Sequence, residues 1–309
     1  MSAQIDPGNG EQGIARALKD LTQKRPVLEP ILRSFGEIMM AKARLVKHLE
    51  SKKSDNRLEL DSSRLLHHTP LLSGLSLEAL QDELSLSFGV MLTVLKQAFS
   101  HLEEVLYRLE AFHREYNLDL SKLSRAYLDG NNTVLREAAQ SLLVPEGILA
   151  LVTSTALGPV LEAVAFPFKE QIRQANWFRG YCPICGSMPS ISFLSEVGDL
   201  GSEFLRGGGG QRYLHCSMCG CEWRIMRNVC PACENEDKDL QFYFQTEDDH
   251  SERVDVCRNC GGYLPCLDLR QSNYRPPMDI AAVGMLHLDA WASEKGYHPL
   301  ARTPWNRVH

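Results

Sequence analysis

The first 181 residues contain no cysteine, although the chain of 309 residues has ten. Four Cys-x-x-Cys pairs hold eight of the ten, a distribution that random placement or a disulfide scaffold rarely gives. The N-terminus also lacks the basic start and apolar run of a secretory signal, which predicts a cytoplasmic protein. In that reducing compartment structural disulfides are rare, whereas cysteine thiolates commonly bind metal.

The sequence has no uninterrupted apolar run long enough to span a membrane. The most apolar stretch spans residues 142–168, and prolines and acidic residues divide it into pieces that are too short: Pro145, Glu146, Pro159, Glu162 and Pro167. The stretch therefore predicts buried helices, and we expect no direct membrane span.

Excess positive charge is absent as well. The net charge is -6, and the chain from Asn176 onward has 13 lysines and arginines against 17 aspartates and glutamates. Proteins that bind nucleic acid neutralise phosphates with basic side chains, so this balance argues against a nucleic-acid-binding zinc ribbon. The glycine run Gly207–Gly210 lacks the Gly-Lys-Ser/Thr of a phosphate-binding loop and predicts a hairpin tip.

Helical periodicity dominates the cysteine-free half. Between Glu11 and Asn176 one apolar stripe recurs at helical spacing: Met91, Val94, Leu95, Ala98, Leu102, Val105, Leu106, Leu109 and Phe112. It predicts a single helix from a cap at Ser76 to about Asn117. Proline breaks predict separate helices at Ile148–Thr155 and Pro159–Asn176. Residues 1–176 are thus predicted to form an all-helical N-terminal domain.

Beyond Trp177 the pattern changes to short β-prone runs: Ser190–Leu194, Tyr213–His215, Glu222–Met226 and Leu240–Gln245. Strands this short bury little apolar surface, so metal crosslinks would supply stability. Residues 279–295 predict a C-terminal helix that stops at Gly296.

The predicted fold class is therefore multidomain α+β. A first rubredoxin-like, zinc-ribbon-type module is expected at residues 177–226. A second such module, with the C-terminal helix, is expected at 227–309.

The four Cys-x-x-Cys pairs predict two metal ions, each held by four thiolates. Two intervening residues let both sulfurs of a pair point to one centre, and two pairs complete the tetrahedron of zinc or a lone iron ion. Consecutive pairing is favoured, because each intervening stretch has the layout of a ribbon hairpin; cross-braced pairing of the first with the third pair stays open. The predicted ligands are Cys182, Cys185, Cys216, Cys219, Cys230, Cys233, Cys257 and Cys260.

The residues after the pairs refine this prediction. Gly186, Gly220 and Gly261 each follow a second cysteine, where a rubredoxin-like knuckle requires positive φ. Glu234 takes that place after the third pair. This departure predicts a looser turn or a more exposed metal.

Two cysteines lie outside the pairs. We expect Cys221 and Cys266 to be small buried side chains; the alternative is a spare thiol that is oxidised, exchanges as a ligand or acts as a nucleophile or sulfur carrier. No Cys/His/acid constellation can be assembled from local signals, so we expect no enzyme activity. His215 is expected to be a strand residue and not a further ligand.

Five segments together carry a family resemblance: Tyr181-Cys-Pro-Ile-Cys-Gly, His215-Cys-Ser-Met-Cys-Gly, Asn228-Val-Cys-Pro-Ala-Cys, Val256-Cys-Arg-Asn-Cys-Gly-Gly-Tyr and Leu286-His-Leu-Asp-Ala-Trp. In this order, behind a helical half, they resemble the FdhE family of formate dehydrogenase accessory proteins. The resemblance implies a cytoplasmic assembly factor that binds the catalytic subunit of formate dehydrogenase before its export or membrane attachment. It also implies rubredoxin-like iron centres at the eight paired cysteines.

Iron is favoured and zinc stays possible, since both accept four thiolates in nearly the same geometry. Zinc would be purely structural, whereas iron could exchange one electron. The main alternative function is a rubredoxin-like electron carrier, which would need exposed centres and a reductase partner. The sequence leaves the oligomeric state open.

Overall fold

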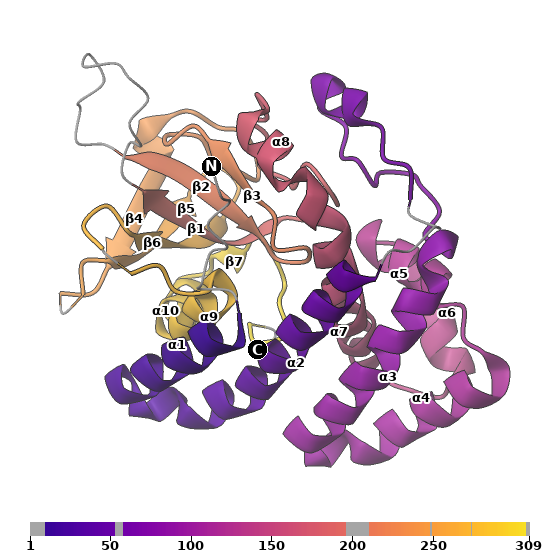
Figure 1. Ribbon diagram of the computed structural model, residues 1–309. Coiled ribbons are helices and arrows are strands. Elements are labelled where there is room, and N and C mark those ends of the chain that lie inside the picture. The colour runs from indigo at the N-terminus through magenta and orange to yellow at the C-terminus, as the bar shows by residue number, and fades with distance from the viewer. Residues whose placement is uncertain (1–9, 53–57, 196–209, 248, 273, 307–309) are drawn as a thin grey trace.

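The computed structural model describes residues 10–52, 58–195, 210–247, 249–272 and 274–306. The expected hairpin tip at Gly207–Gly210 lies mostly outside these described residues. Helices make up the N-terminal half: α1 Glu11–Lys24, α2 Glu29–Ser51, α3 Gln81–Ala98, α4 Glu103–Tyr116, α5 Leu120–Leu128, α6 Asn132–Ser141, α7 Glu146–Ala165 and α8 Lys169–Gln174. Strands dominate the C-terminal half, and the two halves lie side by side (Figure 1). The predicted α+β fold class is confirmed.

The apolar stripe belongs to two helices, so the single helix predicted from Ser76 to Asn117 is wrong. α3 ends where Phe99 leaves helical geometry, with φ -133° and ψ 74°, and α4 begins four residues later. The Phe99 ring packs edge-on against Phe35 of α2, with the ring centroids 5.6 Å apart. The apolar stripe is continuous because the apolar faces of both helices pack against the same core. The predicted end is found, since Asn117 closes α4 in the left-handed region. The predicted start is not: Ser76 Oγ accepts from the Glu78 amide, but Glu78–Leu80 form a separate 3-10 turn and α3 begins at Gln81 without a side-chain cap.

Pro159 does not divide α7, contrary to the prediction of two helices there. The helix runs through it from Glu146 to Ala165, although a proline cannot donate the usual backbone hydrogen bond. Packing against α2, α3, α5 and α6 holds the helix on both sides of the proline. The stretch Glu146–Gln174 is long and apolar enough to cross a membrane, but 67% of its apolar window is buried inside the protein. The expectation of buried helices is confirmed.

One mixed sheet runs through the cysteine half. Its strands are β1 Pro189–Ser195, β2 Gln211–Cys216, β3 Glu222–Ile225, β4 Gln241–Gln245, β5 Glu252–Cys257, β6 Gly262–Asp268 and the short β7 His298–Pro299. Their order is β3-β2-β1-β6-β5-β4, with β7 beside β6. Two antiparallel three-stranded ribbons therefore join where β1 and β6 run parallel, with Ser192 opposite Cys266. The division into modules at residue 226 stays a prediction, and the sheet extends across it.

The C-terminal segment forms two helices instead of the single helix predicted at 279–295. α9 spans Met278–Gly284 and α10 spans Leu286–Glu294, with the break at Met285. Gly296 follows with φ +84°, as expected for a stop. α9 contacts α1, α2 and β1, while α10 contacts β5 and β6, so these helices join the sheet to the helical half (Figure 1).

The described residues form two apolar cores. The larger joins the helical half to the first ribbon and includes the first four paired cysteines with Trp177 and Trp223. The smaller lies between the sheet and α9 and α10, around Phe193, Val254, Tyr263 and Leu288. The first pair of knuckles is thus built into the main core.

Candidate metal centres

The structure gathers the eight paired cysteines into two clusters by consecutive pairing. Centre 1 consists of Cys182, Cys185, Cys216 and Cys219, and centre 2 of Cys230, Cys233, Cys257 and Cys260. Within each cluster the sulfurs all lie within 4.8 Å of one another. The cross-braced alternative, which would combine the first and third pairs, is not found in this arrangement.

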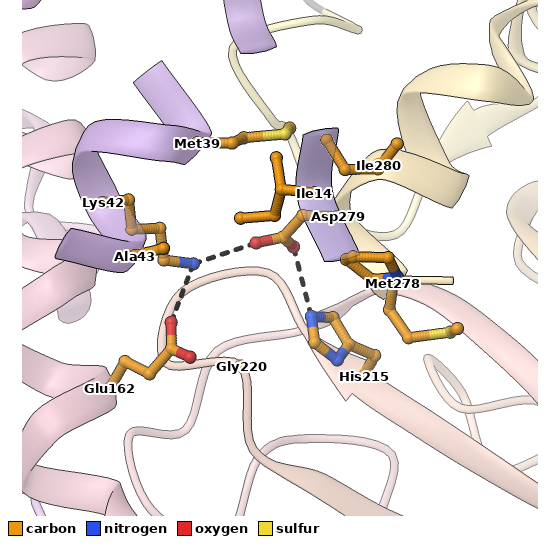
Figure 2. A pocket seen from close by; sticks show the side chains of 11 residues that line it. Ile14, Met39, Lys42, Ala43, Glu162, His215, Gly220, Met278, Asp279 and Ile280 are labelled. Atoms are coloured by element: carbon orange, nitrogen blue, oxygen red, sulfur yellow. Dashed lines mark hydrogen bonds and ion pairs between the residues drawn. The ribbon is translucent and has the colours of Figure 1, made fainter. Parts of the chain in front are cut away.

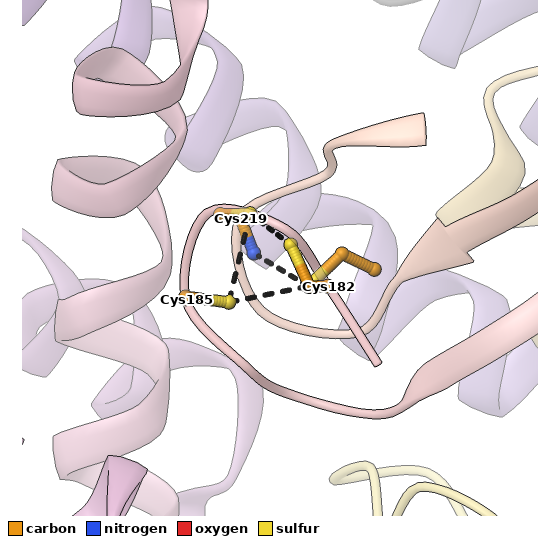
Figure 3. Close-up of side chains that lie close together, drawn as sticks. Cys182, Cys185 and Cys219 are labelled. Carbon is orange, nitrogen blue, oxygen red and sulfur yellow. Dashed lines mark hydrogen bonds between the residues drawn. The ribbon is translucent and has the colours of Figure 1, made fainter. Parts of the chain in front are cut away.

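Knuckle turns place the sulfurs of centre 1. The amide of Gly186 donates to the Cys182 carbonyl at 2.9 Å, and Gly186 and Gly220 have φ of +80° and +61°. These turns aim the amides of Ile184 and Met218 at sulfurs, at 3.4 Å each. Such hydrogen bonds favour thiolates over thiols. Figure 3 shows Cys182, Cys185 and Cys219 converging at the tips of these loops beside a helix.

Centre 2 repeats this construction with one difference. The amide of Glu234 donates to the Cys230 carbonyl at 2.9 Å, so Glu234 occupies the turn position that glycine takes elsewhere. Its φ is +56°, in the left-handed region that is costly for a residue with a Cβ. The side chain of Asn259 donates to the Cys233 sulfur at 3.4 Å.

The sulfur spacing fits tetrahedral thiolate coordination. A metal–sulfur bond of about 2.3 Å implies sulfurs about 3.8 Å apart in a regular tetrahedron. The sulfurs of Cys230 and Cys260 lie 3.7 Å apart, and those of Cys233 and Cys257 lie 3.8 Å apart. In centre 1 the Cys182–Cys219, Cys185–Cys216 and Cys185–Cys219 sulfurs lie 3.5, 3.4 and 3.7 Å apart. Four thiolates complete the shell and leave no position for a catalytic water.

Without a cation, burial makes most thiols of centre 1 costly to ionise. Burial raises the pKa of Cys182, Cys216 and Cys219 well above the ordinary value. Burial also opposes ionisation of Cys185, but hydrogen bonds from the neighbouring sulfurs outweigh it and lower that pKa. Four thiolates can be buried together at low cost in free energy only when a bound cation neutralises their charge. A metal ion supplies that charge.

A buried ionic cluster, which we call the hub, ties centre 1 to the helical half. Nε2 of His215 lies 3.1 Å from Asp279 of α9, and its Nδ1 lies 3.3 Å from Glu222. Lys42 of α2 lies 2.9 Å from Asp279 and 3.0 Å from Glu162 of α7 (Figure 2). His215 is therefore not a ligand of centre 1, as expected. It belongs instead to the hub, which sequence spacing does not reveal because its members come from four distant segments.

The electrostatics of the hub are strongly coupled. Burial alone would lower the pKa of His215, but Asp279 and Glu222 outweigh it and raise the pKa to about 9. Burial opposes ionisation of Asp279 too, yet Lys42 and His215 hold its pKa well below the ordinary value. The hub therefore holds compensating charges in the folded protein.

Both unpaired cysteines are buried. Cys221 is 1% exposed beside centre 1, and Cys266 is 0% exposed on β6. The sulfur of Cys266 lies near Ser192 and Arg253 and within the field of Asp255, and burial raises its pKa to about 11. These positions agree with the expectation of small buried side chains.

Residues 181–227 match the family model "FdhE, central domain". The chain is 32% identical to an FdhE homolog from Aquifex aeolicus over 145 residues, which is 46% of this chain and 48% of that protein. It is 33% identical to protein FdhE of Escherichia coli O1:K1 / APEC over 121 residues, 38% of this chain and 35% of that protein. The matches thus span about half or less of the length of these relatives.

The fold is also similar to a solved structure. The crystal structure of the FdhE protein from Pseudomonas aeruginosa superposes with a TM-score of 0.62 over 94% of this chain and 93% of that one, at 21% identity. The resemblance to the FdhE family expected from the cysteine motifs is confirmed.

Proposed function

We propose that this chain is an accessory factor for the production of active formate dehydrogenase, because residues 181–227 match the FdhE central domain and the fold is similar to that of an FdhE protein. In this proposal it binds the catalytic subunit in the cytoplasm, before export or membrane attachment, and has no turnover of its own. The match of residues 181–227 to the FdhE central domain carries the proposal.

The shape of the molecule supports a binding role. A groove of about 1300 Å³ lies between the helical half, the knuckles of centre 1 and the C-terminal segment. Its lining includes partly exposed apolar residues: Leu128, Ala150, Met188 and Tyr297. A concave surface with apolar side chains in its wall can bury an apolar segment of another polypeptide. We assign the catalytic subunit to this groove.

Co-purification tests the proposal. Tagged protein should retain the formate dehydrogenase catalytic subunit from anaerobically grown cells of its host, and deletion of its gene should abolish formate oxidation. Ala150→Arg places a long cation in the groove and should reduce retention about tenfold or more. Ala163→Arg is the matched control, because Ala163 is a half-buried alanine of the same helix that does not line the groove. Unchanged formate oxidation in the deletion strain would refute the role.

We further propose that the centres hold iron, with zinc as the alternative. Both ions fit four thiolates, but only iron exchanges an electron at ordinary potentials. Elemental analysis and a visible spectrum of anaerobically purified protein decide between them. Two iron ions per chain with ferric thiolate absorption supports the proposal, and two zinc ions without colour refutes it.

The partial exposure of centre 2 is the one observation that favours an electron carrier instead. Cys233 and Cys260 are only half-buried, and an exposed edge is what electron transfer between proteins requires. Electron transfer from a reductase at full rate without formate dehydrogenase would favour that function. Loss of formate oxidation together with absent electron transfer would favour the accessory role.

A further inference from the structure

We propose that the two centres differ in metal exchange: the ion at centre 2 passes readily to competing ligands, whereas the ion at centre 1 is retained as a structural crosslink. The inference requires that both clusters hold metal and does not depend on the formate dehydrogenase role. Five features of the structure carry it.

Access to the sulfurs is unequal. In centre 1 no cysteine is more than 4% exposed. In centre 2 Cys230 and Cys257 are each 3% exposed, but Cys233 and Cys260 reach solvent. Metal leaves a thiolate site when an incoming ligand displaces one sulfur at a time, so an exposed pair of ligands provides the entry point.

The helical half covers centre 1. The amides of Leu71 and Leu72 donate to the carbonyls of Pro183 and Ile184 inside the first knuckle, at 2.9 and 2.8 Å. Both leucines are fully buried, as is Ile184. Displacing Cys182 or Cys185 would therefore break hydrogen bonds that have no access to water, which is expensive.

The knuckle between Cys230 and Cys233 of centre 2 is less well covered. Glu234 is exposed and pairs with Arg179 across an open surface, with 49% and 39% of these side chains accessible. Asn259, the side-chain donor to the Cys233 sulfur, is also exposed. Exposed pairs of this kind contribute little to stability and open readily.

Backbone strain favours opening at the same knuckle. Glu234 holds φ at +56° only while the turn between Cys230 and Cys233 is closed. A residue with a Cβ relaxes from this region once its ligand constraint is gone. Gly186 and Gly220, at the equivalent turns of centre 1, store no such strain.

The other side of centre 2 is anchored. Gly261 has φ +71° and lies against His298, while the ring of Tyr263 is 1% exposed. Cys257 therefore stays in place while Cys233 dissociates. The exchange is a ligand substitution without electron transfer: the incoming thiolate or nitrogen donor forms one bond to the metal, and Cys233 leaves as a thiolate.

Chelator competition tests the proposal on full-length protein loaded with two zinc ions. With an excess of 4-(2-pyridylazo)resorcinol, one zinc ion per chain should leave at least about tenfold faster than the other. Release of both ions at one rate would overturn the proposal.

Cadmium-113 NMR identifies which ion leaves first. Protein loaded with cadmium should give two resonances, and Asn259→Ala, which keeps all eight ligands, should shift only that of centre 2. The resonance that Asn259→Ala shifts should disappear first on adding EDTA. Earlier loss of the unshifted resonance would overturn the assignment.

Glu234→Gly tests the contribution of strain without removing a ligand. Relief of the left-handed glutamate should slow the fast release about fivefold. Glu236→Gly, the same change at an exposed position two residues later, is the matched control and should leave the rate unchanged or raise it. A rate for Glu234→Gly equal to that of the wild type would refute the role of strain.

Discussion

A buried carboxyl group that has no cation beside it among the described residues should make this protein less stable as pH rises through neutrality. Asp289 of α10 is 5% exposed, and no group in the described part of the chain hydrogen-bonds to its Oδ1. Burial raises its pKa to about 7, although a hydrogen bond from Tyr263 opposes the shift. The ordinary value is 3.8. Between these two pH values Asp289 is protonated in the folded protein and ionised in the unfolded chain.

The direction follows from proton linkage. Between pH 4 and 7 the folded state binds one more proton at Asp289 than the unfolded state, so stability falls as pH rises. The contribution is fully present below the unfolded pKa and lost as pH rises through the folded one. Stability should fall by about 2 kcal/mol from pH 5.5 to 7, and the cost of ionising Asp289 above pH 7 is of order 2–4 kcal/mol.

Asp289→Asn removes the titration and keeps the shape. Urea unfolding of metal-loaded protein at pH 5.5, 7 and 8 should show a flatter pH dependence for the variant than for the wild type. Asp20→Asn is the control, because Asp20 is 53% exposed and lies 3.7 Å from Arg16 in a surface pair. Parallel curves for the wild type and Asp289→Asn would contradict the reasoning.

Three further predictions follow from packing and charge. Asp279→Asn leaves Lys42 with one carboxylate in the buried hub and should cost about 3 kcal/mol in urea unfolding, whereas a loss under about 0.5 kcal/mol would show that the hub is solvated. Gly180→Ala places a Cβ 1.7 Å from the Pro231 carbonyl oxygen, so the turn between Cys230 and Cys233 must shift, and the free energy of unfolding should fall by about 1–3 kcal/mol. An unchanged midpoint would show that this backbone moves aside at no cost. Alanine at either unpaired cysteine should leave two metal ions per chain by elemental analysis, and loss of one ion would make that cysteine a ligand.

Local patterns alone predicted much of the candidate site. Cys-x-x-Cys spacing fixes two sulfurs on one turn, and the glycine after it permits positive φ, so the knuckles follow from a few adjacent residues. The sequence also showed that Glu234 replaces the glycine that follows the other three pairs. In the structure Glu234 has left-handed backbone geometry. The strands near Ser190, Tyr213, Glu222 and Leu240 were also predicted. Their signals, β-prone residues and the turn residues that bound them, act over short distances in the sequence.

Elements whose limits depend on distant packing were not predicted correctly. The stripe from Met91 to Phe112 has the same period whether one helix or two carry it, and only the Phe99 contact with Phe35 decides for two. Pro159 lies inside α7 because neighbouring helices hold that helix on several sides, which local propensity does not record.

The sequence by itself determined which residues can hold metal and how each knuckle turns, since those properties depend on residues a few positions apart. Tertiary structure alone decided that β1 and β6 join two ribbons into one sheet, and that α9 carries Asp279 to His215. It also buried centre 1 beneath the helical half and left an edge of centre 2 in solvent. Contacts between segments 60 or more residues apart depend on how whole surfaces pack, which no local spacing encodes.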